Sequence, residues 1–215
     1  MAQLIDGKAI SQQIKDELKA EVEALRNDGT DICLAVIQVG DDPASSVYVR
    51  NEKRACAYIG VESRAYELPE DTTEEQLVEL VKELNADDTV NGILVQLPLP
   101  AQIDEDKIIR TISADKDVDG FHPESVGRLW IGEKGFSSCT PAGIIQLLKR
   151  SNISIEGKEC VIIGRSNIVG KPMAALLLRE NGTVTVAHSR TKILRSSKTS
   201  RYPDCCNWKR AFYHI

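Results

Sequence analysis

The stretch Lys158–Pro172, KECVIIGRSNIVGKP, decides the fold of the second half of the chain. Its residues Cys160–Ile163 form a short apolar run rich in β-branched side chains, which predicts a strand buried on both faces. Gly164 ends that strand, and Gly170 precedes Pro172 and the helix-forming run MAALLLREN. A strand, a glycine-bounded turn and a helix present free backbone N–H groups at a positive helix end, where a phosphate can bind.

The spacing of the two glycines leaves two interpretations of this turn. G-x-x-x-x-x-G differs from the dinucleotide pattern G-x-G-x-x-G, so the turn could be purely structural. The run Thr183–Arg190, TVTVAHSR, favours nucleotide binding because it predicts the next parallel strand, ending in Ser189 and Arg190. The second strand of a Rossmann unit ends at the adenosine ribose, where an acidic residue selects NAD. Ser189, Arg190 and Arg165 instead offer hydroxyl and cationic donors, which suit a ribose 2′-phosphate, so the sequence predicts a preference for NADP.

The composition is that of an ordinary globular protein. The 215 residues are 42% hydrophobic and 27% charged with a net charge of −5, which argues against nucleic acid or an anionic membrane as a partner. No apolar run approaches the roughly 20 residues that span a bilayer, and the N-terminus lacks the layout of a signal peptide, so a cytoplasmic location is expected. Cys33, Cys56, Cys139 and Cys160 lie singly and are expected to be small buried residues, and no metal site is expected.

The first half of the chain alternates helical and strand patterns. Helices are expected at Ile10–Leu25, residues 46–60, Glu74–Asn85 and Ile103–Ile112, and strands at Ile32–Val39, Glu62–Leu68 and Gly92–Leu97. This order predicts an α/β fold with a parallel sheet and helices on both of its faces. Ligands of such sheets bind beyond the carboxyl ends of the strands, which places Gly40 and Gln96 at one cleft.

The charged loop Asp115–Pro123, DKDVDGFHP, is the expected joint between two domains. A helix is predicted farther along the chain, with Thr140 as its N-cap and Pro141 in its first turn. The sequence therefore predicts a parallel-sheet domain over residues 1–138 and a partial Rossmann-type domain over residues 139–192.

Four residues of the first half are candidates for a site, and each has an ordinary alternative. Tyr48 suits stacking on a flat heterocycle, but a half-buried helix aromatic is at least as common. Lys53 could be a desolvated base, although a solvated helix lysine is the usual case. Gln96 is a polar residue at the end of an apolar strand, where it needs a structural or ligand partner. Asp119 could simply cap a turn.

The motifs YVRNEKRACAYIG, NGILVQLPLP, DKDVDGFHPESVGRLW, CTPAGI and VIIGRSNIVGKPMA resemble the bifunctional methylenetetrahydrofolate dehydrogenase/methenyltetrahydrofolate cyclohydrolase family. The resemblance runs from Met1 to about Lys192. It implies a homodimeric enzyme that oxidises methylenetetrahydrofolate with NADP and hydrolyses the product to formyltetrahydrofolate. The alternative is a catalytically inactive remnant that binds folate or NADP, or dimerises.

The resemblance also implies roles for particular residues. Tyr48 would stack on the folate, Gln96 would hold a catalytic lysine and Asp119 would hydrogen-bond the pterin ring. The residues implied at NADP are Gly164, Arg165, Ser166 and Ser189.

The chain departs from the family pattern at the lysine. The pattern places this lysine four residues after the tyrosine, a position that Glu52 occupies here, and Lys53 follows it. A shift of one residue rotates a helical side chain by roughly 100°. Lys53 could still reach the cleft through its flexible stem, but a carboxylate would then occupy the catalytic position. We expect a badly impaired cyclohydrolase step.

The second departure is the tail, residues 193–215, which loses all apolar periodicity. Back-translation of Asp204–Lys209 and a shift by one base give mostly small or β-branched apolar codons. We expect residues 193–215 to be an out-of-frame tail, caused by a one-base insertion near Thr191–Lys192. The nucleotide domain would then be incomplete, with an exposed sheet edge.

Overall fold

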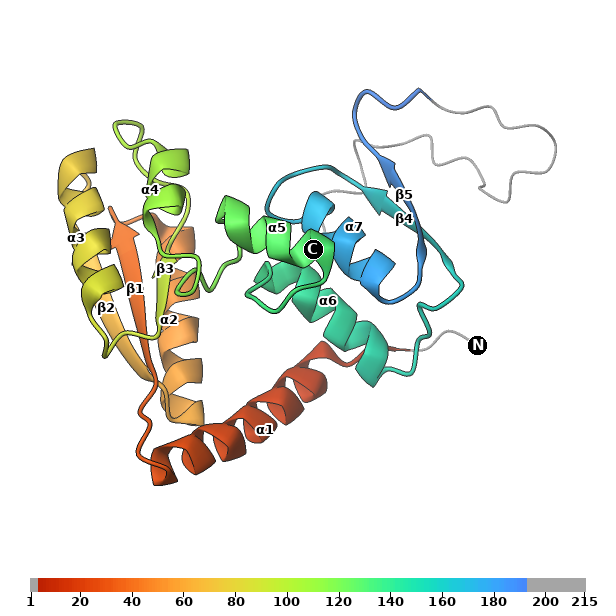
Figure 1. Cartoon of the computed structure of the whole chain (residues 1–215), viewed down its shortest axis with the longest axis horizontal. Coiled ribbons are helices and arrows are strands. Elements are labelled where there is room, and N and C mark those ends of the chain that lie inside the picture. The colour runs from red at the N-terminus through yellow and green to blue at the C-terminus, as the bar shows by residue number, and fades with distance from the viewer. Residues whose placement is uncertain (1–3, 193–215) are drawn as a thin grey trace.

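The computed structural model describes residues 4–192, apart from the side chains of residues 44–46. Two lobes stand beside each other, and α1 (Gly7–Asn27) runs beneath them (Figure 1). This helix packs against one helix of each lobe. Within residues 4–192, no helix combines the length and apolar character that a bilayer-crossing segment needs. The predicted out-of-frame tail lies outside the described residues, so its interpretation stays a prediction.

The first lobe is a parallel sheet between helices. Its elements are β1 (Cys33–Val39), α2 (Pro43–Ile59), β2 (Glu62–Leu68), α3 (Glu74–Ala86), β3 (Gly92–Val95) and α4 (Glu105–Thr111). The strand order is β2-β1-β3, and both pairings are parallel. Leu77 and Val81 of α3 cover one face, while Val49 of α2 is buried on the other side (Figure 1). The predicted parallel sheet with helices on both faces is therefore confirmed.

The third strand ends earlier than expected, at Val95 instead of Leu97. The backbone N–H of Gln96 still donates to the carbonyl of Ile37 at 2.8 Å. The Leu97–Pro98 peptide bond is cis, and Pro98 has no N–H with which to continue the ladder. The chain therefore turns away from the sheet at Gln96.

The second lobe holds a smaller parallel sheet. Its elements are α5 (Pro123–Ile131), α6 (Cys139–Arg150), β4 (Glu159–Ile163), α7 (Gly170–Arg179) and β5 (Thr183–Ala187). β4 pairs with β5 in parallel, and the core between the sheet and the helices contains Ile145, Ile162, Met173 and Leu177. The N-cap of α6 is Ser138, not the predicted Thr140. The sequence patterns did not predict α5, which packs against α7 and so lies with this lobe.

The expectation that Cys160–Ile163 is buried on both faces is wrong. Ile162 is 9% exposed, whereas its neighbours Val161 and Ile163 are 46% and 42% exposed. The reason is that the core helices cover one face of the two-stranded sheet, while the other face is open in the part of the chain that the structure describes. The next strand also ends earlier than predicted, at Ala187, so Ser189 and Arg190 follow it in a turn.

Candidate active site

A cleft of about 500 Å³ opens between the two lobes. It is bounded by the middle of α2, the end of β3, the loop before α5, the start of α6 and the loop before α7. Its lining residues are Tyr48, Asn51, Glu52, Ala55, Leu94, Val95, Gln96, Leu97, Asp119, Phe121, Cys139, Thr140 and Ile168. The cleft thus brings together three of the four predicted site residues of the first half, and it lies at the carboxyl end of β3 as expected for a parallel sheet.

Helix α2 supplies one wall of the cleft. Tyr48 and Glu52 are four residues apart, which places them on one face of the helix. The Tyr48 side chain is 69% exposed, so its ring is free to stack on a flat ligand.

The structure does not bring Lys53 into this cleft. The helical rotation between neighbouring residues turns Lys53 toward a separate hollow of about 370 Å³, between α2 and the β1–β2 side of the sheet. There it lies with Arg50, Asp41 and Glu67. The prediction that Lys53 belongs to the site by way of its flexible stem is therefore wrong for this structure, and Glu52 is the α2 residue with an ionisable carboxyl in the cleft.

Glu52 is an unusually placed carboxyl group. Its Oε1 atom is buried and makes no hydrogen bond within the described residues. Burial raises the pKa of Glu52 to about 7, and the charge of Asp119 adds to the effect. A carboxyl group that is desolvated and faces another acid resists ionisation.

The loop between the lobes positions Asp119. Asp117 is 2% exposed and accepts hydrogen bonds from the His122 backbone N–H at 2.8 Å and from Ser125 Oγ at 2.7 Å. Gly120 has φ 67°, and a Cβ there would lie 2.7 Å from Ser137 Cα, so glycine lets this loop approach the start of α6. Burial, followed by the charge of Asp117, raises the pKa of Asp119 to about 6.

The end of β3 presents Gln96 to the cleft. Its side-chain Nε2 donates to the carbonyl of Leu97 at 2.8 Å. The structure therefore gives Gln96 the structural partner that a polar strand end needs, while leaving the side chain at the cleft surface.

Sequence reasoning missed several residues of the cleft, including Cys139. This cysteine was expected to be a small buried residue, but it is exposed at the first position of α6. Partial desolvation of the thiol among its neighbours, with the charges of Asp119 and Glu52, raises its pKa. Its place at the predicted start of the second domain was the signal that it lies where the two lobes meet.

The loop between β4 and α7 is shaped by its two glycines and by Ser166. Gly164 has φ 135°, and its N–H donates to the carbonyl of Ala187 at 2.8 Å. A Cβ on Gly170 would lie 2.6 Å from the Gly164 oxygen, so both ends of the loop depend on glycine. Ser166 Oγ accepts hydrogen bonds from the Val169 and Gly170 backbone N–H groups at 3.2 and 3.3 Å.

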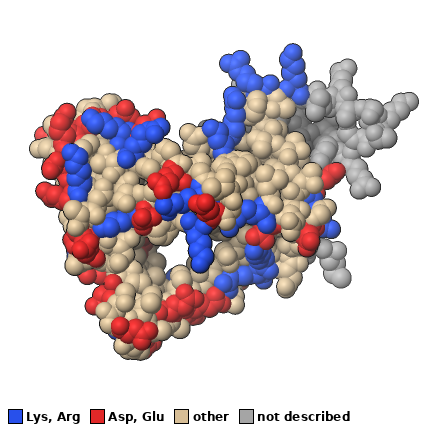
Figure 2. Space-filling view, in the orientation of Figure 1, with Lys and Arg blue, Asp and Glu red and all other residues tan. Residues whose placement is uncertain are grey.

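The turn after β5 lies beside this loop. Ile163 pairs with Ala187, so Arg165 and Ser189 follow two neighbouring strand ends, and both side chains are exposed. The turn is closed by hydrogen bonds between His188 and Thr191. Lys and Arg side chains project from the upper edge of the second lobe, toward which β5 runs (Figures 1 and 2). Exposed cationic and hydroxyl groups around a glycine-bounded turn fit a phosphorylated dinucleotide.

A hydrogen bond links the phosphate-type loop to the cleft. Ser138 Oγ, just before α6, donates to the carbonyl of Ile168. Ile168 belongs to the loop before α7 and also lines the cleft. The loop before α7 and the wall of the cleft that carries Tyr48 therefore border the same space.

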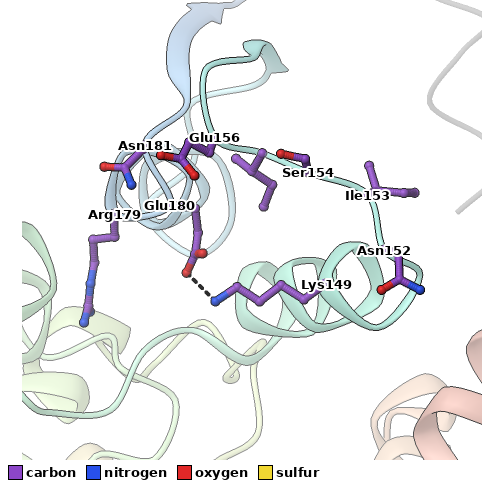
Figure 3. A pocket seen from close by; sticks show the side chains of 9 residues that line it. Lys149, Asn152, Ile153, Ser154, Glu156, Arg179, Glu180 and Asn181 are labelled. Carbon is purple, nitrogen blue, oxygen red and sulfur yellow. Dashed lines mark ion pairs between the residues drawn. The ribbon is translucent and has the colours of Figure 1, made fainter.

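Another hollow, of about 430 Å³, lies in the second lobe, at the end of the β4–β5 sheet opposite to the loop before α7 (Figure 3). Lys149 and Glu180 face each other in it and form an ion pair at 2.7 Å. It is formed where α6 and α7 end and before β4 begins, which is not where parallel sheets bind their ligands. Between residues 4 and 192, no three His, Cys, Asp or Glu side chains form a group that could hold a metal ion.

Comparison with known families gives two matches that cover most of the chain. Residues 5–119 match the family described as "Tetrahydrofolate dehydrogenase/cyclohydrolase, catalytic domain". Residues 138–201 match "Tetrahydrofolate dehydrogenase/cyclohydrolase, NAD(P)-binding domain". The second match extends into the predicted out-of-frame tail.

Individual relatives agree with these matches. The bifunctional protein FolD of Lachnoclostridium phytofermentans is 69% identical over 194 residues, covering 90% of this chain and 69% of the relative. A crystal structure of FolD from Campylobacter jejuni is 52% identical with a TM-score of 0.86, over 88% of this chain and 68% of that one. A Trypanosoma brucei methylenetetrahydrofolate dehydrogenase-cyclohydrolase, complexed with NADP cofactor and inhibitor, is 39% identical with a TM-score of 0.83, over 88% and 65% of the two chains.

Proposed function

Because the chain belongs to the tetrahydrofolate dehydrogenase/cyclohydrolase family, we propose that it oxidises methylenetetrahydrofolate with NADP in one-carbon metabolism and that Glu52 impairs its cyclohydrolase step. The observation that carries this proposal is the position of Glu52 inside the cleft, with Lys53 turned into a separate hollow. Because Glu52 takes the place of the lysine in the cleft, only the cyclohydrolase step is expected to suffer, and the dehydrogenase step is not.

The dehydrogenase step needs positioning more than acid–base chemistry. When bound, NADP supplies the hydride acceptor, and the protein brings it to the folate. Tyr48 offers the stacking surface and Asp119 a hydrogen-bonding carboxyl group for the pterin ring. The loop of Gly164, Arg165 and Ser166 offers the phosphate site, and Ile168 connects that loop to the cleft. Holding two reactants in one cleft removes much of the entropic barrier of a bimolecular reaction.

The cyclohydrolase step needs a group that assists the attack of water on the methenyl carbon and transfers protons. The family pattern supplies a lysine for this purpose at the position of Glu52. A lysine and a carboxyl group carry opposite charges, so Glu52 cannot stabilise the negative charge that develops on the attacking oxygen.

The test is to exchange the two neighbours, in the double variant Glu52→Lys/Lys53→Glu. We expect cyclohydrolase activity to rise at least about tenfold, because removing a single electrostatic stabiliser typically changes kcat by 10² or more. Hydrolysis of methenyltetrahydrofolate is followed by its absorbance, with Lys53→Glu alone as the matched control that should bring no gain. Full cyclohydrolase activity in the unaltered chain would contradict the proposal.

A second candidate is a catalytically inactive remnant that retains folate or NADP binding. The open face of the β4–β5 sheet favours it, since Val161, Ile163 and Val186 are each at least 39% exposed. A dehydrogenase assay beside ligand-induced thermal shifts separates the two candidates. Turnover supports the enzyme, and a thermal shift without turnover supports the remnant. Homodimerisation and a cytoplasmic location remain predictions from the family resemblance.

A further inference from the structure

The cleft between the lobes is acidic. Its lining residues in the described part of the chain include two carboxyl groups, Glu52 and Asp119, and neither lysine nor arginine. The other polar members, such as Gln96 and Thr140, are neutral. A site of this kind selects against anions and favours groups that carry or acquire positive charge.

The proposed reaction creates such a group. A hydride, which is a hydrogen with the electron pair of its C–H bond, leaves the methylene carbon of the folate for the nicotinamide ring. The carbon keeps its bonds to two nitrogens, and their lone pairs replace the lost electrons. The neutral methylene bridge thus becomes an amidinium-type cation, the methenyl group, without any proton being gained or lost.

We propose that Glu52 is a specificity-determining residue whose carboxylate binds the methenyl cation, so that the cleft retains the product of the dehydrogenase step instead of hydrolysing it. The proposal rests on the proposed function, because the cation arises only if this cleft holds the folate. Glu52 then has a function of its own, because an anion that opposes the hydrolysis step favours the oxidation step that precedes it.

The surroundings of Glu52 support this role. Its Oε1 atom is buried without a hydrogen-bond partner, which is unfavourable for the free protein and is relieved by a cation in the cleft. The titratable groups that face it are Asp119 from the interlobe loop, Cys139 from α6 and Cys56 on its own helix. None of these groups neutralises a carboxylate.

The charge balance of these groups predicts proton release on binding. Burial raises the pKa of Glu52 to about 7 and that of Asp119 to about 6, so a large fraction of Glu52 is protonated near pH 6.5. A cation bound between the two groups favours their ionised forms. Binding of the methenyl cation therefore displaces a proton, whereas binding of neutral-ring tetrahydrofolate does not.

The experiment compares two ligands with the same skeleton, methenyltetrahydrofolate and tetrahydrofolate, without NADP. Stopped-flow fluorescence measures both affinities at pH 6.5 and pH 8 before the cation hydrolyses. In Glu52→Gln we expect the methenyl affinity at pH 8 to fall at least about tenfold and the tetrahydrofolate affinity to change less than about twofold. The matched control is Glu23→Gln, which removes the same charge from an exposed position on α1.

Proton release by the unaltered protein provides a second measurement that needs no variant. A weakly buffered solution with a pH indicator should report release of a fraction of a proton per bound methenyltetrahydrofolate at pH 6.5. Equal loss of both affinities in Glu52→Gln, or methenyl binding without proton release, would overturn the role of Glu52. Failure of the unaltered protein to bind either ligand would instead overturn the proposed function.

Discussion

Two carboxyl groups of the cleft, Glu52 and Asp119, titrate close to neutral pH. Burial is the main cause for both, and a neighbouring acid adds to each shift. Most carboxyl groups of a folded protein have pKa values of about 4, so two raised pKa values in one cleft point to a functional site. The pair also makes the stability of the folded chain depend on pH.

We expect Glu52→Gln to stabilise the protein more at pH 8 than at pH 4.5. The ordinary pKa of Glu52 is 4.5 and its folded value is about 7, so between these values the unfolded chain is ionised while the folded chain keeps the proton. The contribution of Glu52 to the stability of the folded chain is therefore most favourable below pH 4.5 and decreases as the pH rises to 7. With a discount for partial solvation, the effect is about 1–2 kcal/mol.

Urea unfolding at the two pH values measures this effect. The free energy of unfolding of Glu52→Gln minus that of the unaltered chain should be larger at pH 8. Glu23→Gln, at an exposed position, serves as the control and should show the same difference at both values. An equal difference for Glu52→Gln would mean that this carboxyl group ionises normally.

Single residues of the cleft could be predicted from the sequence when a motif or a strand end marked them. Tyr48, Gln96 and Asp119 were found in this way, and helical periodicity separated Glu52 from Lys53. Ile168 and Cys139 were not found, because their role depends on how two lobes come together. No local pattern carries that information.

At the scale of elements, the loop from β4 to α7 depends on the contact between its two glycines. The Gly170 backbone approaches the Gly164 carbonyl so closely that a side chain at 170 would displace it. Gly143 is a helical glycine of the same lobe at which a Cβ would meet nothing within 4 Å. The two positions form a matched pair for substitution.

We expect Gly170→Ala to weaken NADP binding at least about tenfold, a change of about 1.4 kcal/mol, because the loop must shift away from the helix end. Gly143→Ala should leave the NADP affinity unchanged and stabilise α6 by about 0.5–1 kcal/mol. Titration of cofactor fluorescence measures both affinities. Unaltered NADP affinity in Gly170→Ala would show that the cofactor does not use this loop.

The β4–β5 sheet shows what the sequence pattern of a single strand can predict and what it cannot. An apolar β-branched run correctly predicted a strand, but it could not reveal that the sheet would be covered on one face only. Burial on both faces requires partners that the described part of the chain does not provide. Helix α5 was missed for a different reason: it is nine residues long and follows a loop-like, charged stretch. Its N-cap, His122, accepts a hydrogen bond from the Glu124 N–H, which is an uncommon signal.

Because the core covers only one face of the β4–β5 sheet, we expect substitutions at neighbouring residues of β4 to differ in their effect on stability. Ile162→Ala removes a buried side chain and should cost about 2–5 kcal/mol, whereas Ile163→Ala at an exposed position should cost less than about 1 kcal/mol. Hydrogen exchange of the β5 backbone amides reports on this lobe alone. Similar losses of protection in the two variants would indicate that the outer face of the sheet is also packed in solution.

At the scale of the whole molecule, the α/β class, the two parallel sheets and the use of strand carboxyl ends followed from the order of the elements. The placement of the lobes did not. Arg150 of α6 forms two hydrogen bonds with the carboxylate of Glu17 on α1, at 2.8 and 2.6 Å, and thereby joins the second lobe to the first helix of the chain. Such a contact between distant segments leaves no trace in local sequence patterns.

The long separation between Glu17 and Arg150, 133 residues, has a consequence for the order of events on the ribosome. At roughly 5–20 residues per second, α1 is made on the order of ten seconds before its partner helix. Meanwhile α1 can pack against α2, whereas its contact with α6 has to wait until that helix has been translated. The N-terminal helix therefore gains its contact with the first lobe early in synthesis, and the Glu17–Arg150 contact that joins it to the second lobe forms only after α6 has been made.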